Sequence, residues 1–300
     1  MSGNSEVMSA RLDLSHLLRA HARTFAVTLR VLPRALRSPL GIAYLLARAS
    51  DTIADAKGIP PERRLTLLGQ LDTALAAEKP QEWRPVLAPG EISLGEGQLI
   101  AALPDLLESF GDPQERGEIL RLWRTILQGQ LFDLRRFGPG AAPLTGEELE
   151  FYCGLVAGSV GAAWTRLIAR HSPRTLLRPA EEMIPLGIAY GKGLQLVNIL
   201  RDRAEDRALG RAYAREEDLP ELFTRAEEWL RSGERYLAGL RPGRILMASS
   251  LPLNLACPTL DLIKKHPELL RAKLPRGRVR RILLRSAASL WLPRPADPAS

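Results

Sequence analysis

Two pairs of aspartates are the side chains in this sequence best suited to chemistry. Asp51 and Asp55 are four positions apart in "ARASDTIADA", and Asp202 and Asp206 are four positions apart in "NILRDRAEDRALGRAY". On a helix such positions are neighbours, with Cβ atoms about 6 Å apart, so two bare carboxylates would repel each other. A divalent cation removes this repulsion, and Mg²⁺ commonly takes one or two carboxylates together with substrate phosphates. The spacing therefore predicts sites for Mg²⁺ and a diphosphate.

The neighbours of each aspartate pair point to the same ligand. Arg48 precedes the first pair by three positions, and Arg201 directly precedes the second. A guanidinium group can bind phosphate oxygens in a bidentate manner. Each pair also ends a strongly apolar stretch, "LGIAYLLARAS" and "IPLGIAYGKGLQLVN". Two facing helices with such ends would form a polar rim above an apolar cavity.

This arrangement suits the ionisation of an allylic diphosphate. Mg²⁺ and cationic side chains would stabilise the leaving pyrophosphate, and a dry apolar cavity would keep the carbocation from water. No nucleophilic side chain is required, and no convincing Ser-His-Asp or Cys-His candidate is evident. The two cysteines, Cys153 and Cys257, have neither the spacing of metal ligands nor that of a disulfide framework. We expect both to be small buried apolar side chains in a protein of a reducing compartment.

Composition and periodicity predict the elements that position these residues. The chain has 300 residues, 45 % hydrophobic and 25 % charged, which is typical of a globular protein with a large core. Apolar residues recur at i, i+3, i+4 and i+7 along most of the chain. Segments rich in Pro and Gly, such as residues 79–98, separate these stretches as loops. We predict an all-α protein in which about ten helices form a single large bundle.

We expect one domain over residues 1–300, with a helical core at about 15–270 and a basic amphipathic tail at 271–300. The net charge is +8, and residues 269–293 hold seven basic residues and no acid. In this tail the cations alternate with apolar residues, a pattern typical of a membrane surface, although a solvated face is the plainer interpretation. No nucleic-acid module is recognised, so nucleic acid is not expected as a partner.

The sequence has neither the apolar core of a signal peptide nor an uninterrupted run of 18 apolar residues. We therefore expect no spanning helix and a cytoplasmic protein, in peripheral contact with the inner face of the cell membrane through its tail.

Three ordered segments, "YLLARASDTIAD", "YCGLVAGSVG" and "LQLVNILRDRAEDRALGRAY", resemble the signatures of the squalene/phytoene synthase family. The resemblance extends over about residues 21–277. It implies an all-α isoprenoid synthase fold with a central cavity. It also implies the head-to-head condensation of two prenyl diphosphates through a cyclopropyl intermediate.

The resemblance assigns roles to individual residues. Ligands of Mg²⁺, or of Mn²⁺ in its place, would be Asp51, Asp55, Asp202, Asp206, Asn198 and Glu205. Diphosphate would be held by Arg23, Arg48, Arg201, Arg211 and Asn198. Tyr152 would handle a proton in the first half-reaction. The cavity would be lined by Phe25, Tyr44 and Gln195, whose aromatic members can stabilise cations through their ring faces.

Plainer interpretations accompany these roles. Phe25, Tyr44 and Tyr152 lie on apolar helix faces, where aromatic side chains usually pack in the core. Arg207 and Arg211 could balance Glu205 and Asp206 as ion pairs on one helix. The glycines of "VAGSVG" lack the preceding strand of a dinucleotide-binding loop, so they predict close helix packing or a local break in a helix.

One departure from the family pattern concerns the metal. Ala54 stands where eukaryotic squalene synthases typically have an acid, which leaves the metal stoichiometry at the first aspartate pair open.

The segments "YCGLVAGSVGAAWTRL", "LNLACPTLDLI" and "AKLPRGRV" resemble the squalene synthase form more than the phytoene synthase form. In that form a late basic cluster binds NADPH, and the matching positions are Lys273 and Arg276 together with Arg48, while Pro275 replaces one basic residue. The leading hypothesis is a squalene synthase that uses two farnesyl diphosphates, Mg²⁺ and NADPH.

Two kinds of alternative remain open. A related enzyme would form presqualene diphosphate, dehydrosqualene, hydroxysqualene or phytoene without reduction. A protein of another class would be a non-catalytic helical binder of nucleic acid or membrane. The oligomeric state and the preferred prenyl chain length are open as well.

Overall fold

The fold is helical throughout the part of the chain that the computed structural model describes. That part comprises residues 14–21, 25–138, 140–266, 274–275 and 277–282, without the side chains of residues 25–27. Within it, twelve α-helices are joined by turns, loops and short 3-10 or π-helical segments, and the only extended pairing is an isolated bridge between Leu176 and Leu240. The prediction of an all-α protein is confirmed, with two more helices than expected.

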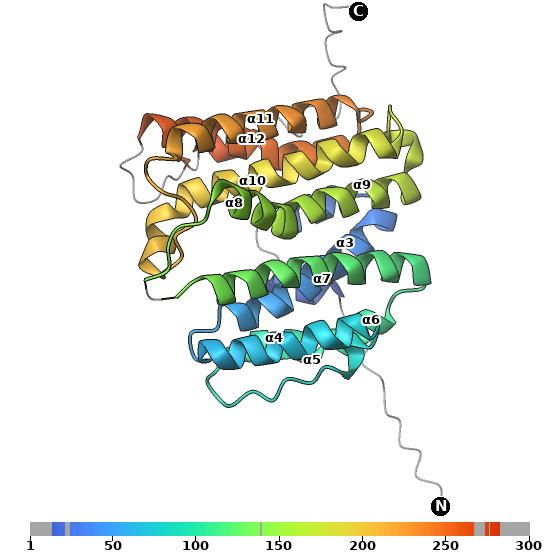
Figure 1. Cartoon of the computed structure of the whole chain (residues 1–300). Helices are drawn as coiled ribbons and strands as arrows, with labels where there is room; N and C mark the ends of the chain where they lie inside the picture. The colour runs from blue at the N-terminus through green and yellow to red at the C-terminus, as the bar shows by residue number, and fades with distance from the viewer. Residues whose placement is uncertain (1–13, 22–24, 139, 267–273, 276, 283–300) are drawn as a thin grey trace, which may run out of the picture.

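The helices form two groups in the order of the chain (Figure 1). The first group consists of α1 (Leu14–His21), α2 (Phe25–Val31), α3 (Arg34–Ala54), α4 (Pro61–Ala76), α5 (Leu94–Ala101), α6 (Leu103–Glu108) and α7 (Pro113–Arg136). The second consists of α8 (Gly146–Cys153), α9 (Ser159–His171), α10 (Ala180–Ala208), α11 (Leu219–Ala238) and α12 (Arg244–Lys265). In the first group α7 packs against α3 and α4; in the second, α10 packs against α9, α11 and α12.

Helices α9 and α10 approach each other backbone to backbone. A Cβ atom added to Gly161 would lie 1.9 Å from the carbonyl oxygen of Gly187, and one added to Gly191 would lie 2.2 Å from that of Ala157. Only glycine fits such contacts, because it carries no Cβ. Between α8 and α9, residues Gly154–Gly158 form a π-helical turn, a rare feature that often marks functional sites. Both alternatives predicted for the glycine-rich segment, close packing and a local break, are therefore present.

The segment 79–98 is only partly a loop. Helix α5 starts at Leu94, after a capping box in which Ser93 accepts a hydrogen bond from the Glu96 backbone N–H and Glu96 accepts one from the Ser93 N–H. Sequence reasoning took Gly95 and Gly97 as loop residues. The capping box satisfies the first backbone N–H groups of the helix and outweighs the low helix propensity of glycine.

Three helical stretches are long and apolar enough to cross a membrane, by length and composition alone: Gly146–His171, Ala180–Ala208 and Arg244–Lys265. None of these stretches is an uninterrupted run of 18 apolar residues, and the expectation that no helix spans a membrane stays a prediction. About half of each apolar window is buried inside the fold, from 44 % to 56 %. Their apolar side chains pack helix against helix and line the cavities described below.

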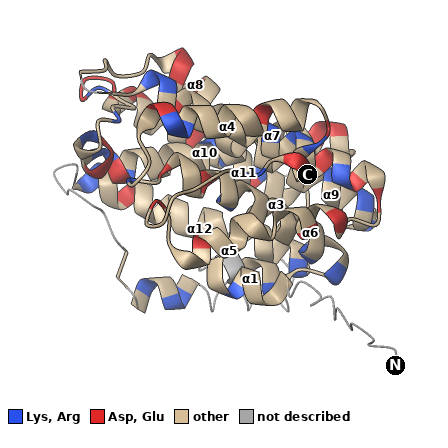
Figure 2. Cartoon of the chain, turned by 90° about the horizontal axis from the view of Figure 1, so that it is seen from below, with Lys and Arg blue, Asp and Glu red and all other residues tan. Residues whose placement is uncertain are grey.

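Acidic and basic residues are interspersed along the helices and at their ends, without one continuous basic face in the view of Figure 2.

Candidate functional site

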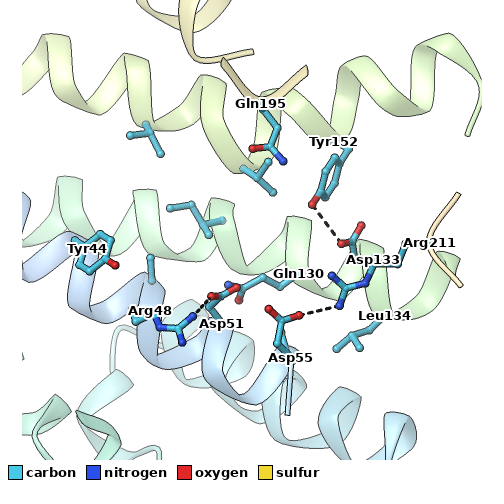
Figure 3. Close-up of a pocket in the computed structure, with 15 residues that line it drawn as sticks. Tyr44, Arg48, Asp51, Asp55, Gln130, Asp133, Leu134, Tyr152, Gln195 and Arg211 are labelled. Atoms are coloured by element: carbon cyan, nitrogen blue, oxygen red, sulfur yellow. Dashed lines mark hydrogen bonds and ion pairs between the residues drawn. The ribbon is translucent and has the colours of Figure 1, made fainter. Parts of the chain in front are cut away.

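A cavity of about 420 Å³ lies between the two groups of helices. Polar side chains reach it from four directions: Tyr44, Arg48, Asp51 and Asp55 from α3, Gln130 and Asp133 from α7, Tyr152 from α8, and Gln195 from α10. Arg211 reaches it from the segment after α10 (Figure 3). The structure thus brings together residues from three of the motifs noted in the sequence, and adds α7, which no motif indicated.

The first aspartate pair faces this cavity, and each of its carboxylates is paired with an arginine. Arg48 Nη1 donates to Asp51 Oδ2 at 2.6 Å, and Arg211 Nη2 donates to Asp55 Oδ1 at 2.8 Å. Burial raises the pKa of Asp51, and the charge of Asp55 raises it further. Two arginines expected to hold diphosphate therefore neutralise the two carboxylates expected to hold metal.

The second aspartate pair lies near the C-terminal end of α10. Arg201 binds Asp202 in a bidentate manner, with Nε to Oδ1 at 2.8 Å and Nη2 to Oδ2 at 2.5 Å. Burial raises the pKa of Asp206 to about 6, and the neighbouring Asp202 adds to this rise. Asp206 and Arg211 line a small side cavity, and Arg211 also lines the main one.

Arg211 is thus the link between the two pairs. Its positive charge lowers the pKa of both Asp51 and Asp206, against the effect of burial. The expectation that all four aspartates open into one cavity needs correction. Asp51 and Asp55 line the main cavity, Asp206 lines the side cavity, and Asp202, held by Arg201, lines neither.

The donor set fits a cation that arrives with its ligand. Among the described residues, no three His, Cys, Asp or Glu side chains cluster closely enough to hold a metal ion by themselves. Mg²⁺ does not need such a cluster, because it keeps several waters and binds through one or two carboxylates and substrate phosphates. The pKa values of Asp51 and Asp206 are raised because burial and a neighbouring carboxylate disfavour their charged forms. A bound cation would stabilise the charged form of each carboxylate.

A second, apolar cavity of about 250 Å³ adjoins the first, and the two share the lining residues Val156, Val160 and Gln195. Its walls come mainly from α9, α10 and α12 and include Trp164, Leu194 and Pro252. The main cavity, which we call the mouth, therefore continues into this apolar cavity, which we call the apolar chamber. Gln195 lies where the two meet.

Asn198 does not lie where its expected role in binding metal and diphosphate would place it. It lines this apolar chamber, one helical turn before Asp202, rather than the cavity that holds Asp51, Asp55 and Arg211.

Asp133 is a site residue that sequence reasoning missed. It is buried on α7, and its Oδ2 accepts hydrogen bonds from Tyr213 at 2.5 Å and from Tyr152 at 3.2 Å. Burial raises the pKa of Asp133 to about 6. The signal in the sequence was weak but present: "QGQLFDLRRF" places Gln130 and Asp133 three positions apart within an apolar helix face.

Other expected residues have definite positions. Tyr44 lines the cavity and donates a hydrogen bond from its hydroxyl to the His21 carbonyl at 2.9 Å. Glu205 is exposed on α10 and lines neither cavity. Arg207 pairs with Glu216 at 2.8 Å, not with the acids of its own helix.

Cys153 is buried, as expected, whereas Cys257 is only partly buried. Burial raises the pKa of Cys153 to about 12 and that of Cys257 to about 11. Four expectations concern parts outside the description: Arg23, Lys273 and Arg276 lie outside the described residues, as does the side chain of Phe25.

Comparison with known proteins gives this geometry a family. A sequence profile described as squalene/phytoene synthase matches residues 18–221. The chain is 32 % identical over 221 residues to the 15-cis-phytoene synthase of Synechocystis sp., covering 71 % of this chain and 57 % of that protein. It is 26 % identical over 317 residues to the squalene synthase of Gibberella zeae, covering 91 % and 63 %. The chain thus spans roughly three fifths of the length of these two relatives.

Solved structures show the same fold. The complex of TcSQS with the ligand E5700 superposes with a TM-score of 0.73 at 23 % identity, covering 91 % of this chain and 84 % of that one. A dehydrosqualene synthase in complex with a ligand gives a TM-score of 0.64 at 19 % identity, covering 92 % and 95 %. The fold is the all-α isoprenoid synthase fold, and the chain belongs to the squalene/phytoene synthase family.

Proposed function

We propose that this protein is a prenyltransferase that condenses two prenyl diphosphates head to head, with farnesyl diphosphate as substrate and squalene as final product. One observation carries the proposal. A mouth lined by Arg48, Asp51, Asp55 and Arg211 continues, past Gln195, into an apolar chamber. Such a site suits a molecule with a charged diphosphate head and a hydrocarbon tail.

The side chains at the mouth would bind and orient the diphosphate. Arg48 and Arg211 would exchange their carboxylate partners for phosphate oxygens, since guanidinium groups bind both in the same planar manner. Asp51 and Asp55, and Asp202 and Asp206 across Arg211, would then hold Mg²⁺. When bound, Mg²⁺ supplies Lewis-acid stabilisation of the leaving pyrophosphate. Asp55 would become free to bind Mg²⁺ once Arg211 had moved from this carboxylate to the phosphate.

The apolar chamber would protect the carbocation. Val156, Val160 and Trp164 line its wall and exclude water from the reacting carbons. Tyr152 lines the main cavity, where its hydroxyl would hold or receive a proton in the first half-reaction.

Squalene is favoured over the related products by the late segments "LNLACPTLDLI" and "AKLPRGRV". Reduction with NADPH would use Arg48 in the cavity wall together with Lys273 and Arg276. Relatives named as squalene synthase and as phytoene synthase both match this chain, so the product has to be measured.

The experiment incubates purified protein with farnesyl diphosphate and Mg²⁺, with and without NADPH, and identifies products by mass. We expect presqualene diphosphate without NADPH and squalene with it. Squalene formation that does not depend on NADPH would refute the reductive assignment. Dehydrosqualene or hydroxysqualene would identify a related enzyme, and phytoene from geranylgeranyl diphosphate would identify a longer-chain one.

We also propose a cytoplasmic protein in peripheral contact with the membrane, since a product soluble only in lipid would benefit from release directly into the bilayer. In the described part of the tail, Arg278, Arg280 and Arg281 are exposed on a helical segment, whereas Val279 and Ile282 are partly buried. Flotation with anionic vesicles would compare the full chain with a version that ends at Leu270. We expect weaker binding of the shorter chain, and equal binding would refute the contact through the tail.

A further inference from the structure

Asp133 is an ionisable group in the cavity wall that no motif accounts for. Its side chain belongs to a residue only 9 % exposed, and no described residue donates a hydrogen bond to its Oδ1. A buried carboxylate oxygen without a partner costs folding free energy, which a purely structural residue would avoid. A functional role would account for a carboxylate at this position.

The partners of Oδ2 supply that reason. Tyr152 and Tyr213 both donate to this atom, their hydroxyl oxygens are 3.3 Å apart, and their rings stack with centroids 5.2 Å apart. Tyr152 lines the main cavity, whereas Tyr213 lines the side cavity behind it. Figure 3 shows the hydroxyl of Tyr152 directed at Asp133. The phenol of Tyr152 thus lies between the main cavity and the carboxylate of Asp133.

Tyr152 is a poor proton acceptor by itself. Burial raises the pKa of this phenol well above its ordinary value, and the charge of Asp133 raises it further. A neutral phenol can take a proton from a substrate only if it gives its own proton to another group. Asp133 lies within hydrogen-bond reach of it and, with its pKa raised to about 6, is a stronger base than an ordinary aspartate.

We propose that Asp133 is the terminal proton acceptor of the cyclopropane-forming step, acting through Tyr152, with Tyr213 as a positioning residue. The proposal rests on the proposed function. Before this step the first prenyl unit has lost its diphosphate, and its C1 has bonded to C2 of the second unit, which leaves a cation at C3 of the second unit. In this step a C–H bond at C1 of the first unit breaks, and its electron pair forms the bond to C3 that closes the ring. The proton passes to Tyr152 Oη while the hydroxyl proton of Tyr152 passes to Asp133 Oδ2. Reversal of the transfer, to water or pyrophosphate in the cavity, restores Asp133, and no oxidant or reductant is needed.

The position of Tyr213 is fixed from two sides. Its ring packs edge-on against Phe137 at 4.9 Å, in addition to its stack on Tyr152. Its hydrogen bond holds Oδ2 toward the phenol of Tyr152. Asp133 therefore cannot rotate away from the cavity without breaking this contact.

The test measures single-turnover formation of presqualene diphosphate from farnesyl diphosphate with hydrogen or deuterium at C1. For Asp133→Asn, which keeps the shape but cannot take the proton, we expect a rate loss of about 100-fold or more. We also expect a larger primary isotope effect than in the wild type, with substrate affinity little changed. Asp133→Glu should recover part of the rate. Asp72→Asn, the same change on α4 at a carboxylate bound by Arg124 and Gln128, is the matched control and should behave as wild type.

Other results would overturn the relay. A wild-type rate in Asp133→Asn would do so, as would a slower rate with lower substrate affinity and no rise in the isotope effect. If Asp133→Asn fails to fold, Tyr213→Phe serves instead: we expect a smaller rate loss with a raised isotope effect, and an unchanged isotope effect contradicts the inference. A wild-type protein that converts no prenyl diphosphate would refute the proposed function and the relay with it, whereas an active wild type with unaffected variants refutes the relay alone.

Discussion

Arg211 Nη2 lies 2.8 Å from Asp55 Oδ1, although 156 positions separate the two residues in the chain. This ion pair connects the end of α3 with the segment after α10, and so joins the two aspartate motifs at the cavity mouth. A diphosphate that enters the mouth competes with Asp55 for the guanidinium of Arg211. The pair is therefore the contact that ligand binding should change first.

Replacement of Arg211 should weaken the use of substrate. For Arg211→Gln we expect kcat/KM to fall by about 10- to 100-fold, or about 1.4–3 kcal/mol, because a charged hydrogen bond to diphosphate is lost. Steady-state kinetics with farnesyl diphosphate measures this. Arg166→Gln is the matched control, since Arg166 is exposed, pairs with Glu118 and lines neither the main nor the side cavity. Equal effects of both substitutions would show that Arg211 acts only through general surface charge.

Replacement of an aspartate in either pair should abolish metal-dependent turnover. We expect Asp51→Asn and Asp202→Asn to lose nearly all activity at any Mg²⁺ concentration, because a neutral amide cannot hold the cation in place of a carboxylate. Removal of Mg²⁺ with a chelator should have the same effect on the wild type. Asp105→Asn, at an exposed position on α6, should leave the Mg²⁺ titration unchanged. Full activity of both site variants would contradict the proposed metal-binding role of the two aspartate pairs.

The buried carboxylate of Asp133 should lower the free energy of unfolding at pH values above about 6. Its folded-state pKa of about 6 lies above the ordinary value of 3.8, so the folded state holds a proton that the unfolded state releases between these values. Stability is thus lost as the pH rises from about 4 to 6, by up to about 3 kcal/mol.

The matching variant tests this linkage. We expect Asp133→Asn to unfold at a higher temperature than wild type at pH 8, with the difference vanishing near pH 4. Thermal unfolding followed by circular dichroism would measure it. A variant less stable than wild type at pH 8 would indicate that the hydrogen bonds of the carboxylate outweigh the cost of its burial.

The close contact of α9 and α10 should not tolerate a methyl group. In Gly161→Ala the new Cβ would lie 1.9 Å from the Gly187 carbonyl oxygen, so the helices must separate. We expect a loss of about 1–3 kcal/mol or more in unfolding free energy. Gly69→Ala on α4 meets no heavy atom within 4 Å and should be neutral or stabilising by up to about 1 kcal/mol. Denaturant unfolding of the two variants compares them, and equal stability would contradict the packing.

The fold could be predicted because apolar spacing alone specifies helices that bury one face. Asp51 and Asp55 could be singled out because like charges at i and i+4 repel and need positive partners, which Arg48 and Arg211 supply in the structure. Asp133 was missed because a single buried aspartate on α7 becomes meaningful only beside Tyr152 and Tyr213, and those contacts are tertiary. The start of α5 was not predicted because Gly95 and Gly97 are typical of loops. In the structure, the capping box of Ser93 and Glu96 stabilises the first turn of the helix there.

The placement of Asn198 shows another limit. It shares α10 with Asp202, one turn away, yet it opens into the apolar chamber. The sequence gives the position of a side chain along the axis of its helix. Which cavity the side chain lines depends on how the neighbouring helices pack around it.

A crystal structure of the protein with Mg²⁺ and a non-ionisable thiolo analogue of farnesyl diphosphate tests the central claim most directly. We predict that the diphosphate lies between α3 and α10, that Arg211 has left Asp55 for a phosphate oxygen, and that the hydrocarbon chain passes Gln195 into the apolar chamber. A complex in which the Arg211–Asp55 pair is intact and the analogue lies outside both cavities would contradict it.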